Sequence, residues 1–176
     1  MKSDNLWYVI TGSSSSGKTT LVAGLAAKGH HVVYETARVY IDQEMAKGRT
    51  ITDIRSDEQA FQKKALEMKI EIEKNLPKNE IVFLDRAIPD TIAYDRLYKY
   101  PQNPLLTEAL KTCSYKKVFL LEQLAYVVDY ARIETKKQQD QLHHYLKEAY
   151  QELGFQIVTV PVLPPEERMQ FILDNL

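Results

Sequence analysis

Residues 12–20 read GSSSSGKTT, and they follow the apolar run WYVIT of residues 7–11. The segment from Gly12 to Thr19 fits the pattern G-x-x-x-x-G-K-[ST], between an expected strand and an expected helix at residues 18–28. The glycines allow backbone conformations that turn successive N–H groups inward, and the helix adds the positive end of its dipole. The stretch therefore predicts a phosphate-binding loop. Its candidate nucleotide-binding residues are Gly12, Ser13, Ser14, Ser15, Ser16, Gly17, Lys18, Thr19 and Thr20.

The last residues of this loop carry the expected chemistry. Lys18 would reach the β- and γ-phosphates of the nucleotide, and the Thr19 hydroxyl would hold Mg²⁺. We therefore expect ATP with Mg²⁺ in the loop, with Lys18 in the catalytic set and Thr19 as a metal ligand. A serine-rich turn without a ligand is the alternative, and the strand–loop–helix context argues against it.

Composition restricts the class of protein. Of the 176 residues, 44% are hydrophobic and 27% are charged, so we expect residues 1–176 to form one domain with a substantial core. The net charge of -1 gives no sign of binding to DNA or RNA or to a membrane surface. A single cysteine, Cys113, excludes an intrachain disulfide and fits a reducing compartment. With no secretory leader and no apolar run near about eighteen residues, the sequence predicts a cytoplasmic protein.

Short apolar segments alternate with helix-like segments along the whole chain. The apolar segments are rich in β-branched and aromatic residues, as is typical of strands covered on both faces. They lie at Trp7–Gly12, His31–Glu35, Ile81–Arg86, Lys117–Glu122 and Gln156–Pro161. The alternation predicts an α/β protein with three layers, α/β/α, around a five-stranded parallel sheet.

Several residues mark the boundaries and faces of the expected helices. Ser56 and Gln59 have the spacing of a capping box. Gly29 and Gly154 stand just before expected strands, where helices commonly end. The helix after Ser56 is expected to bury an apolar stripe, which consists of Phe61, Ala65, Met68 and Ile72.

The strand expected at residues 81–86 ends in charged residues. Asp85 stands at its carboxyl end, where ligands bind in open α/β sheets, and we interpret it as a catalytic metal ligand together with Thr19. Arg86 and Asp90 follow in the sequence DRAIPD and are expected beside Asp85 at the mouth of the site. Arg86 would contact the transferred phosphoryl group or the acceptor, and Asp90 would contact the substrate. A plain surface ion pair is the alternative for Arg86.

The second expected strand also ends in charge. Its sequence VVYETAR places Glu35 at the strand end and Arg38 one turn later. A carboxylate there, facing a phosphate loop, can accept the proton of a substrate hydroxyl or bind that hydroxyl. Glu35 is therefore a candidate catalytic and substrate-binding residue, and Arg38 a candidate substrate-binding residue. The alternative is that Glu35 caps the next helix or pairs with Arg38.

A charged segment, VVDYARIETKKQQD, follows the fourth expected strand. Such a segment can bring cations over the triphosphate and exclude water, and we expect Arg132 to have this catalytic role. For Lys136 and Lys137 the alternative is a solvated helix face with i,i+4 ion pairs.

These residues together resemble a known family. The segments YVITGSSSSGKTTL, VVYETAR, VFLDRAIPD, DYARIE and YQELGFQIVTVPVLPPEERMQFIL are similar to those of the NadR-type AAA domain family. The resemblance covers the chain from about Trp7 to its C-terminus. It implies a P-loop NTPase fold with the kinase-like strand order 2-3-1-4-5. The family includes the ribosylnicotinamide kinase domain, which phosphorylates a nucleoside, and also proteins regarded as nucleotide-binding regulators.

A more distant resemblance concerns the segment AFQKKALEMK. It is similar to a helix of the deoxynucleoside kinases that carries a Phe-Gln pair against the base of the acceptor. Carried over to this chain, the resemblance implies that Phe61 and Gln62 bind the substrate. Phe61 fits the core stripe equally well.

Two classes of function are compatible with these residues. The first is a kinase that transfers the γ-phosphoryl group of ATP to a hydroxyl of a small, nucleoside-like acceptor bound between Glu35 and Asp85. The second is a nucleotide-dependent switch, or a slow ATPase or GTPase, without a small-molecule acceptor. The charges at Glu35 and Arg38 favour the kinase, because a switch needs no charged acceptor site. We expect a monomer or a homodimer.

Overall fold

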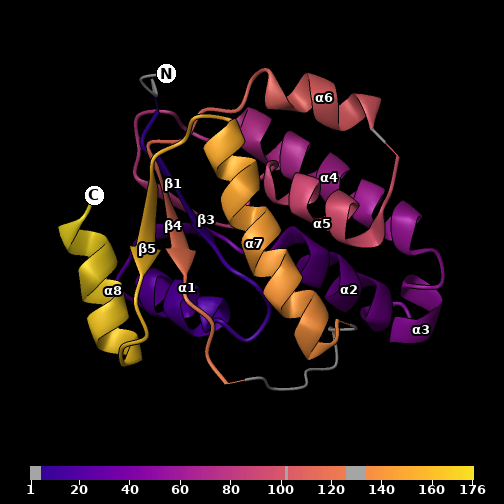
Figure 1. Ribbon diagram of the computed structural model, residues 1–176, viewed down its shortest axis with the longest axis horizontal. Helices are drawn as coiled ribbons and strands as arrows, with labels where there is room; N and C mark the ends of the chain where they lie inside the picture. The colour runs from indigo at the N-terminus through magenta and orange to yellow at the C-terminus, as the bar shows by residue number, and fades with distance from the viewer. Residues whose placement is uncertain (1–4, 102, 126–133) are drawn as a thin grey trace.

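A parallel sheet forms the centre of the molecule. Figure 1 shows a computed structural model of the chain, and the structure describes residues 5–101, 103–125 and 134–176. The strands are β1 (Trp7–Thr11), β2 (His31–Val33), β3 (Val82–Asp85), β4 (Lys117–Leu121) and β5 (Ile157–Val160). They form a 5-stranded sheet in the order β2-β3-β1-β4-β5, and each neighbouring pair is parallel. The strand order predicted from the sequence is confirmed.

Helices cover both faces of this sheet. They are α1 (Lys18–Ala27), α2 (Thr36–Ala46), α3 (Ile51–Ile54), α4 (Glu58–Asn75), α5 (Asp90–Tyr98), α6 (Pro104–Leu110), α7 (Lys136–Glu152) and α8 (Pro165–Asp174). Helices α1 and α8 lie against one face and α7 against the other, with α5 beside α7 and with α4 and α6 beyond them (Figure 1). None of the helices in the described ranges combines the length and the apolar character that crossing a bilayer requires.

The strands have a core on each side because successive side chains point to opposite faces. In β1, Ile10 packs with Leu25 of α1, whereas Val9 packs with Tyr150 of α7, and all four side chains are fully buried. Both faces of the strand are therefore apolar, as expected in a parallel sheet between two helical layers. The predicted three-layer α/β/α architecture is confirmed.

The parallel arrangement brings the carboxyl ends of the strands to one edge of the sheet. Ile10, near the end of β1, is in register with Asp85, at the end of β3, and β2 ends beside β3. The loop that follows β1 therefore lies next to the residues that follow β2 and β3. This edge positions the site.

The helix boundaries agree with the sequence predictions at two glycines and differ from them at one helix start. Gly29 and Gly154 follow α1 and α7 with φ values of 86° and 75°, as helix-terminating glycines do. The capping box expected at Ser56 is wrong. Asp57 caps α4 instead, because its carboxylate accepts a hydrogen bond from the N–H of Ala60 at 3.0 Å.

The buried face of α4 is more polar than the sequence predicts. Phe61 and Ala65 are buried as expected, whereas Met68 and Ile72 are only half-buried. The other residues that α4 buries are Gln62, Leu66, Lys69 and Glu73. The helix therefore turns charged side chains toward the inside of the protein.

Candidate functional site

The loop between β1 and α1 has the backbone shape of an anion-binding nest. Gly12, Ser15 and Gly17 have positive φ values of 151°, 60° and 83°. A Cβ at Gly12 would lie 2.8 Å from Ser16 Oγ and 3.0 Å from the carbonyl oxygen of Leu121, so the position requires glycine. Among the described residues, no side chain caps the N-terminus of α1, and no acidic residue lies in its first turn. The N–H groups of this helix end are therefore available to phosphate oxygens.

Lys18 closes the loop on itself. Its Nζ donates hydrogen bonds to the carbonyl oxygens of Gly12 and Ser13, both at 2.8 Å, and to Ser16 Oγ at 3.2 Å. The side chain is buried but still lines the pocket beside the loop. The ammonium group is thus held where the phosphates of a nucleotide would lie.

Arg168 of α8 braces the same loop from behind. The residue is 2% exposed, and its guanidinium donates to three carbonyl oxygens: Ser16 at 2.7 Å, Glu122 at 2.9 Å and Pro161 at 2.8 Å. Because a peptide group is planar and trans, a carbonyl fixed toward Arg168 directs the following N–H, that of Gly17, the opposite way. Arg168 therefore orients the Gly17 N–H, for which the sequence predicts phosphate binding, and ties the loop to the ends of β4 and β5.

Asp85 ends β3 and has the properties of a ligand for a hard cation. It is 4% exposed, and its Oδ1 is fully buried with no hydrogen-bond partner among the described residues. Burial and the nearby negative charge of Glu35 raise the pKa of Asp85 to about 7. An orphaned carboxylate oxygen, together with the Thr19 hydroxyl on the wall of the pocket, fits the all-oxygen coordination of Mg²⁺.

Other protein ligands for a metal are scarce. Within the described ranges, no group of three or more His, Cys, Asp or Glu side chains could hold a metal ion. Mg²⁺ at this site would therefore depend on the nucleotide phosphates and water for its remaining ligands, as is usual for this ion.

Arg86 links the ends of β2 and β3. Its Nε donates to Glu35 Oε1 at 2.9 Å and its Nη1 donates to Asp90 Oδ1 at 3.2 Å. The guanidinium also lies 5.4 Å from the centre of the Tyr94 ring. Arg86 has a φ of 66°, in the left-handed region that most side chains avoid. The residue is 4% exposed, so it is a buried cation and not the surface ion pair that was the alternative.

Asp90 lies behind the pocket. It is completely buried, and besides Arg86 its carboxylate accepts hydrogen bonds from Thr11 Oγ1 at 2.6 Å, from the N–H of Ala87 at 3.0 Å and from the Tyr150 hydroxyl at 2.5 Å. The expectation that Asp90 contacts the substrate is therefore corrected. At the first residue of α5 its carboxylate turns toward the sheet, where it holds Arg86 in place.

Glu35 stands between the phosphate loop and the rest of the pocket. Burial alone would raise the pKa of Glu35, but the positive charges around it outweigh burial and lower its pKa to about 2. The charges that act this way are those of Arg86, Lys18, Arg38 and Lys69. Glu35 occupies the position before α2, yet its side chain makes no capping hydrogen bond there. Its carboxylate is therefore ionised and directed into the site.

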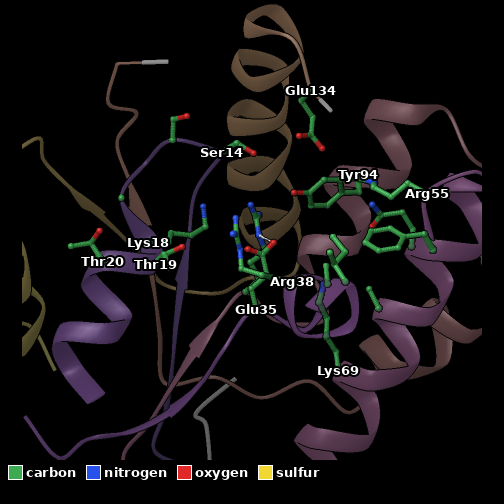
Figure 2. Close-up of a pocket in the computed structure, with 18 of the residues that line it drawn as sticks. Ser14, Lys18, Thr19, Thr20, Glu35, Arg38, Arg55, Lys69, Tyr94 and Glu134 are labelled. Atoms are coloured by element: carbon green, nitrogen blue, oxygen red, sulfur yellow. Dashed lines mark hydrogen bonds and ion pairs between the residues drawn. The ribbon is translucent and has the colours of Figure 1, made fainter. Parts of the chain in front are cut away.

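One continuous cavity of about 460 Å³ joins these groups. Figure 2 shows Lys18 at one end, Glu35 near the middle and Arg55 toward the other end. The residues that line it are Ser14, Ser15, Gly17, Lys18, Thr19, Thr20, Glu35, Ala37, Arg38, Ile41, Arg55, Phe61, Gln62, Ala65, Lys69, Arg86, Tyr94, Leu124, Ala125 and Glu134. The structure thus brings together the predicted phosphate loop with Glu35, Arg38, Phe61, Gln62 and Arg86. We name the loop Gly12–Thr20, most of which lines the cavity, its phosphate end, and the lining residues from Glu35 to Tyr94 its acceptor end.

The wall of the acceptor end combines apolar side chains with charged and polar ones. Phe61 is 3% exposed and packs with Ile41 and Ile54, so it belongs both to a core cluster and to the pocket wall. The Arg55 guanidinium lies 4.7 Å from the centre of the Phe61 ring. Gln62 Nε2 donates to Glu58 Oε1 at 2.8 Å. This surface has room for a flat, partly polar molecule.

The segment after β4 is described only at its ends. Arg132, for which the sequence predicts a role over the triphosphate, lies outside the described residues. Glu134 is buried, lines the pocket and accepts a hydrogen bond from the Tyr98 hydroxyl at 3.0 Å. Lys136 is exposed and pairs with Asp140 one turn along α7, as in the alternative interpretation for that residue.

Sequence reasoning missed four residues of the site and its support: Arg55, Lys69, Tyr94 and Arg168. A signal was present for Lys69, which lies seven residues after Gln62 and therefore on the same helical face. For Arg168 no such signal exists, because its partners are backbone carbonyl oxygens far away in the sequence.

Comparisons with known proteins agree with this geometry. A family model described as an AAA domain matches residues 7–168. No curated protein sequence gives a significant match. A solved structure of the NadR protein in complex with NR superposes on 97% of this chain and 49% of its own, with a TM-score of 0.71 and 22% identity. The chain therefore spans about half the length of that NadR chain.

Two other solved structures match over nearly their whole length. Deoxyadenosine kinase from M. mycoides with bound dCTP covers 96% of this chain and 97% of its own, with a TM-score of 0.67 and 14% identity. Shikimate kinase from Acinetobacter baumannii in complex with shikimate covers 97% of this chain and 92% of its own, with a TM-score of 0.60 and 17% identity. At these identities the likeness shows a P-loop kinase fold.

Proposed function

The chain belongs to the AAA domain family, and on that premise we propose that it is an ATP-dependent kinase that phosphorylates a hydroxyl group of a small, nucleoside-like molecule. The observation that carries this proposal is the ion pair between Glu35 and Arg86, on the wall of the cavity that also contains the phosphate loop. A protein that only binds or hydrolyses a nucleotide has no need of an ionised carboxylate beyond the phosphates.

Glu35 is proposed to receive the proton in the transfer. The acceptor oxygen forms a bond to the γ-phosphorus, the bond from that phosphorus to the β,γ-bridging oxygen breaks, and ADP leaves with its electron pair. The hydroxyl proton passes to Glu35 Oε. With a pKa of about 2, Glu35 is a weak base, but phosphoryl transfer proceeds through a loose transition state and depends mainly on positioning. An ionised carboxylate orients the hydroxyl and takes the proton as the new bond forms.

The cations of the site are proposed to stabilise the negative charge of the phosphoryl group during its transfer. Lys18 and the loop N–H groups hold the β- and γ-phosphates, and Arg86 faces the transferred group from the acceptor side. Mg²⁺ held by Thr19 and Asp85 would neutralise charge on the same phosphates. Arg132 is proposed to add a further positive charge from the segment after β4. Asp90, with Thr11, Ala87 and Tyr150 on its oxygens, keeps Arg86 aimed into the pocket.

The chemical class of the proposed acceptor is inferred from the residues that line the acceptor end of the cavity. Phe61 offers an aromatic face, and Gln62 offers an amide at the margin of the pocket, a combination suited to a heterocyclic base. Arg38 lines the cavity one turn after Glu35 and would contact the same molecule. Two of the similar solved structures, the NadR complex and deoxyadenosine kinase, are of proteins whose ligands are nucleosides or nucleotides, which supports this choice.

Glu35→Gln tests the proposal because it retains the shape of the side chain and removes its charge. In a screen of nucleosides, nucleotides and vitamins with Mg-ATP, we expect at least one compound to be phosphorylated by the wild-type protein. Glu35→Gln should lower that transfer by about 10² to 10⁴ if Glu35 is the general base, while the Kd of ATP changes only a few-fold. Transfer is measured with labelled ATP and affinity by calorimetry.

Glu80→Gln is the matched control. Glu80 is exposed beside His31, at the opposite end of the sheet from the site, so this variant should transfer phosphate as the wild type does. A different pattern would favour a nucleotide-dependent switch or a slow NTPase. In that case no compound raises nucleotide consumption above background, and Glu35→Gln leaves hydrolysis unchanged.

A further inference from the structure

Lys69 of α4 brings a buried ammonium group to the acceptor end of the pocket. The residue is 7% exposed and lines the cavity together with Glu35, Arg38 and Ala65. Figure 2 shows its side chain rising from α4 toward the middle of the pocket, where Glu35 and Arg38 lie. Gln62 and Lys69 are seven residues apart, which places them on one face of α4 about 10 Å apart along its axis.

Within the part of the chain that the structure describes, no hydrogen bond or ion pair reaches the Lys69 ammonium. Three carboxylates are near enough to act on its charge, and each already accepts hydrogen bonds from other groups: Glu35, Glu73 and Asp90. Glu73, for example, accepts a hydrogen bond from the Tyr115 hydroxyl at 2.7 Å. Lys69 is therefore close to negative charge without being bound by it.

Other cations of the pocket differ from Lys69 in this respect. Lys18 donates to the carbonyl oxygens of its own loop, Arg86 pairs with Glu35, and Arg55 binds Glu58 through two hydrogen bonds of 2.6 Å and 2.8 Å. The ammonium of Lys69 is directed into the cavity instead.

The side chains that line the pocket include more basic than acidic residues. Among the described lining residues, five are basic, namely Lys18, Arg38, Arg55, Lys69 and Arg86, and two are acidic, namely Glu35 and Glu134. Lys18 is assigned to the nucleotide, Arg55 is paired with Glu58, and Arg86 is paired with Glu35 and Asp90, whereas Lys69 has no ion-pair partner among the described residues. Burying an ammonium without a partner is unfavourable, and burial accordingly lowers the pKa of Lys69. A negatively charged group on a ligand would supply the missing partner.

We propose that Lys69 binds an anionic group of the acceptor molecule itself, a carboxylate or a phosphate that the molecule carries in addition to the hydroxyl group that is phosphorylated. This inference rests on the proposed function, because it assigns the acceptor to the same cavity. The competing physical account is that Lys69 only balances the charges of Glu35, Glu73 and Asp90. In that account its removal affects neutral and anionic ligands alike.

Matched pairs of ligands test the inference. With the pocket saturated by Mg²⁺ and the non-hydrolysable analogue AMP-PNP, calorimetry measures the binding of adenosine and AMP, of thymidine and TMP, and of shikimate and its amide. The first two pairs form the phosphate arm and the third pair the carboxylate arm. In at least one arm the wild-type protein should bind the anionic member at least about tenfold more tightly, as expected for a partly buried charge-assisted contact.

Substitutions at Lys69 then show whether this residue causes the preference for the anionic member of each pair. Lys69→Met keeps the length of the stem and should reduce the ratio between paired ligands to about threefold or less, whereas Lys69→Arg should keep it. Lys69→Gln serves as a second neutral variant if Lys69→Met does not fold. Lys64→Met is the matched control, because Lys64 lies on the exposed face of the same helix and should leave the ratio unchanged.

Several results would overturn the inference: a wild-type protein without preference for the anionic members, binding of none of the compounds, or an equal loss for both members in Lys69→Met. Phosphoryl transfer from ATP, measured with the same compounds, tests the proposed function separately. Transfer to neutral acceptors alone supports a kinase and refutes the role of Lys69. A preference that Lys69→Met abolishes, without any transfer, supports the anion site and refutes the kinase.

Discussion

The two ends of the pocket are built in different ways. The phosphate end is one continuous segment, Gly12–Thr20, whose shape is set by positive φ values and whose brace, Arg168, binds only carbonyl oxygens. The acceptor end gathers side chains from separate elements, among them Glu35 before α2, Lys69 on α4 and Arg86 after β3. The phosphate end is therefore fixed by backbone conformation and by hydrogen bonds to backbone carbonyl oxygens. The acceptor end is fixed by interactions between charged side chains.

This difference predicts how each end responds to substitution. A change behind the phosphate end should alter nucleotide affinity and leave the acceptor unaffected, because the hydrogen bonds from Arg168 that fix the loop involve no side chain of the acceptor end. At the acceptor end the pKa of Glu35 depends on the charges of Arg86, Arg38 and Lys69, together with that of Lys18 from the phosphate end, so one change should spread to its neighbours. Substitutions at Asp85, Arg168 and Glu73 test the comparison, from the largest expected effect to the smallest.

Asp85→Asn should have the largest effect, because Asp85 lies where the two ends meet. Asparagine keeps the shape of the side chain but loses the charge that would orient Mg²⁺ and its waters. We expect phosphoryl transfer to fall by at least about 100-fold at every Mg²⁺ concentration, while the Kd of ATP changes only a few-fold. Single-turnover assays with labelled ATP and calorimetry measure the two quantities.

Asp140→Asn is the control for this change, since Asp140 is exposed on α7 and pairs with Lys136. Turnover of Asp85→Asn near the wild-type level would assign the metal to a different carboxylate. Asp85 would then have no role that connects the phosphate end with the acceptor end.

The same difference explains what could be predicted from the sequence. The strands and the phosphate loop are local features, and the apolar run before Gly12 and the motif itself predict both. Glu35 and Asp85 could be predicted because parallel strands bring their carboxyl ends together. Strand order came from the family resemblance and not from the pattern of apolar residues.

Other features depend on distant parts of the chain and could not be predicted. Asp90 is adjacent to Arg86 in the motif, but the hydroxyls of Thr11 and Tyr150 turn its carboxylate away from the pocket. The spacing of Lys69 from Gln62 places it on the same helical face, but nothing local shows which neighbours from other elements will bury it. The partners of Arg168 are carbonyl oxygens, which every residue has.

Arg168→Met should have the next largest effect, and only at the phosphate end. It removes the donor that fixes the Ser16 carbonyl, so the N–H of Gly17 is no longer held toward the phosphates. We expect the Kd of Mg-ATP to rise about tenfold, equivalent to about 1.4 kcal/mol, with the KM of the acceptor unchanged. Calorimetry with AMP-PNP measures the first quantity and steady-state kinetics the second.

Two further proteins show whether Arg168 positions the loop or only stabilises the fold. Arg168→Lys should recover part of the nucleotide affinity, because an ammonium can still bind one carbonyl oxygen. Arg96→Met removes a half-buried arginine that pairs with Glu152, away from the site, and should leave the affinity unchanged. A lower melting temperature with an unchanged Kd would make Arg168 a purely structural residue, and a higher acceptor KM would contradict the separation of the two ends.

Glu73→Gln should have the smallest effect, on the pH dependence of stability. Glu73 is buried one turn beyond Lys69, and burial raises its pKa to about 7 although Tyr115 and the N–H of Ile88 donate hydrogen bonds to it. A carboxyl group with a raised pKa binds its proton more tightly in the folded state than in the unfolded one. Its contribution therefore favours folding at low pH and is lost as the pH rises from about 4.5 through about 7. Glutamine cannot ionise; its single oxygen can still accept from the N–H of Ile88, and its amide group can donate to the Tyr115 oxygen.

Urea unfolding of both proteins at pH 5.5 and pH 7.5 measures this contribution. Between these two conditions the wild-type protein should lose on the order of 1 kcal/mol more stability than Glu73→Gln. Glu71→Gln, on the exposed side of the same helix, should follow the wild type. If the wild type and Glu73→Gln lose stability equally, buried charge behind the acceptor end is not a source of pH sensitivity. If the wild type loses more stability than Glu73→Gln, the charged residues behind the acceptor end make the stability of the protein depend on pH, through Glu73.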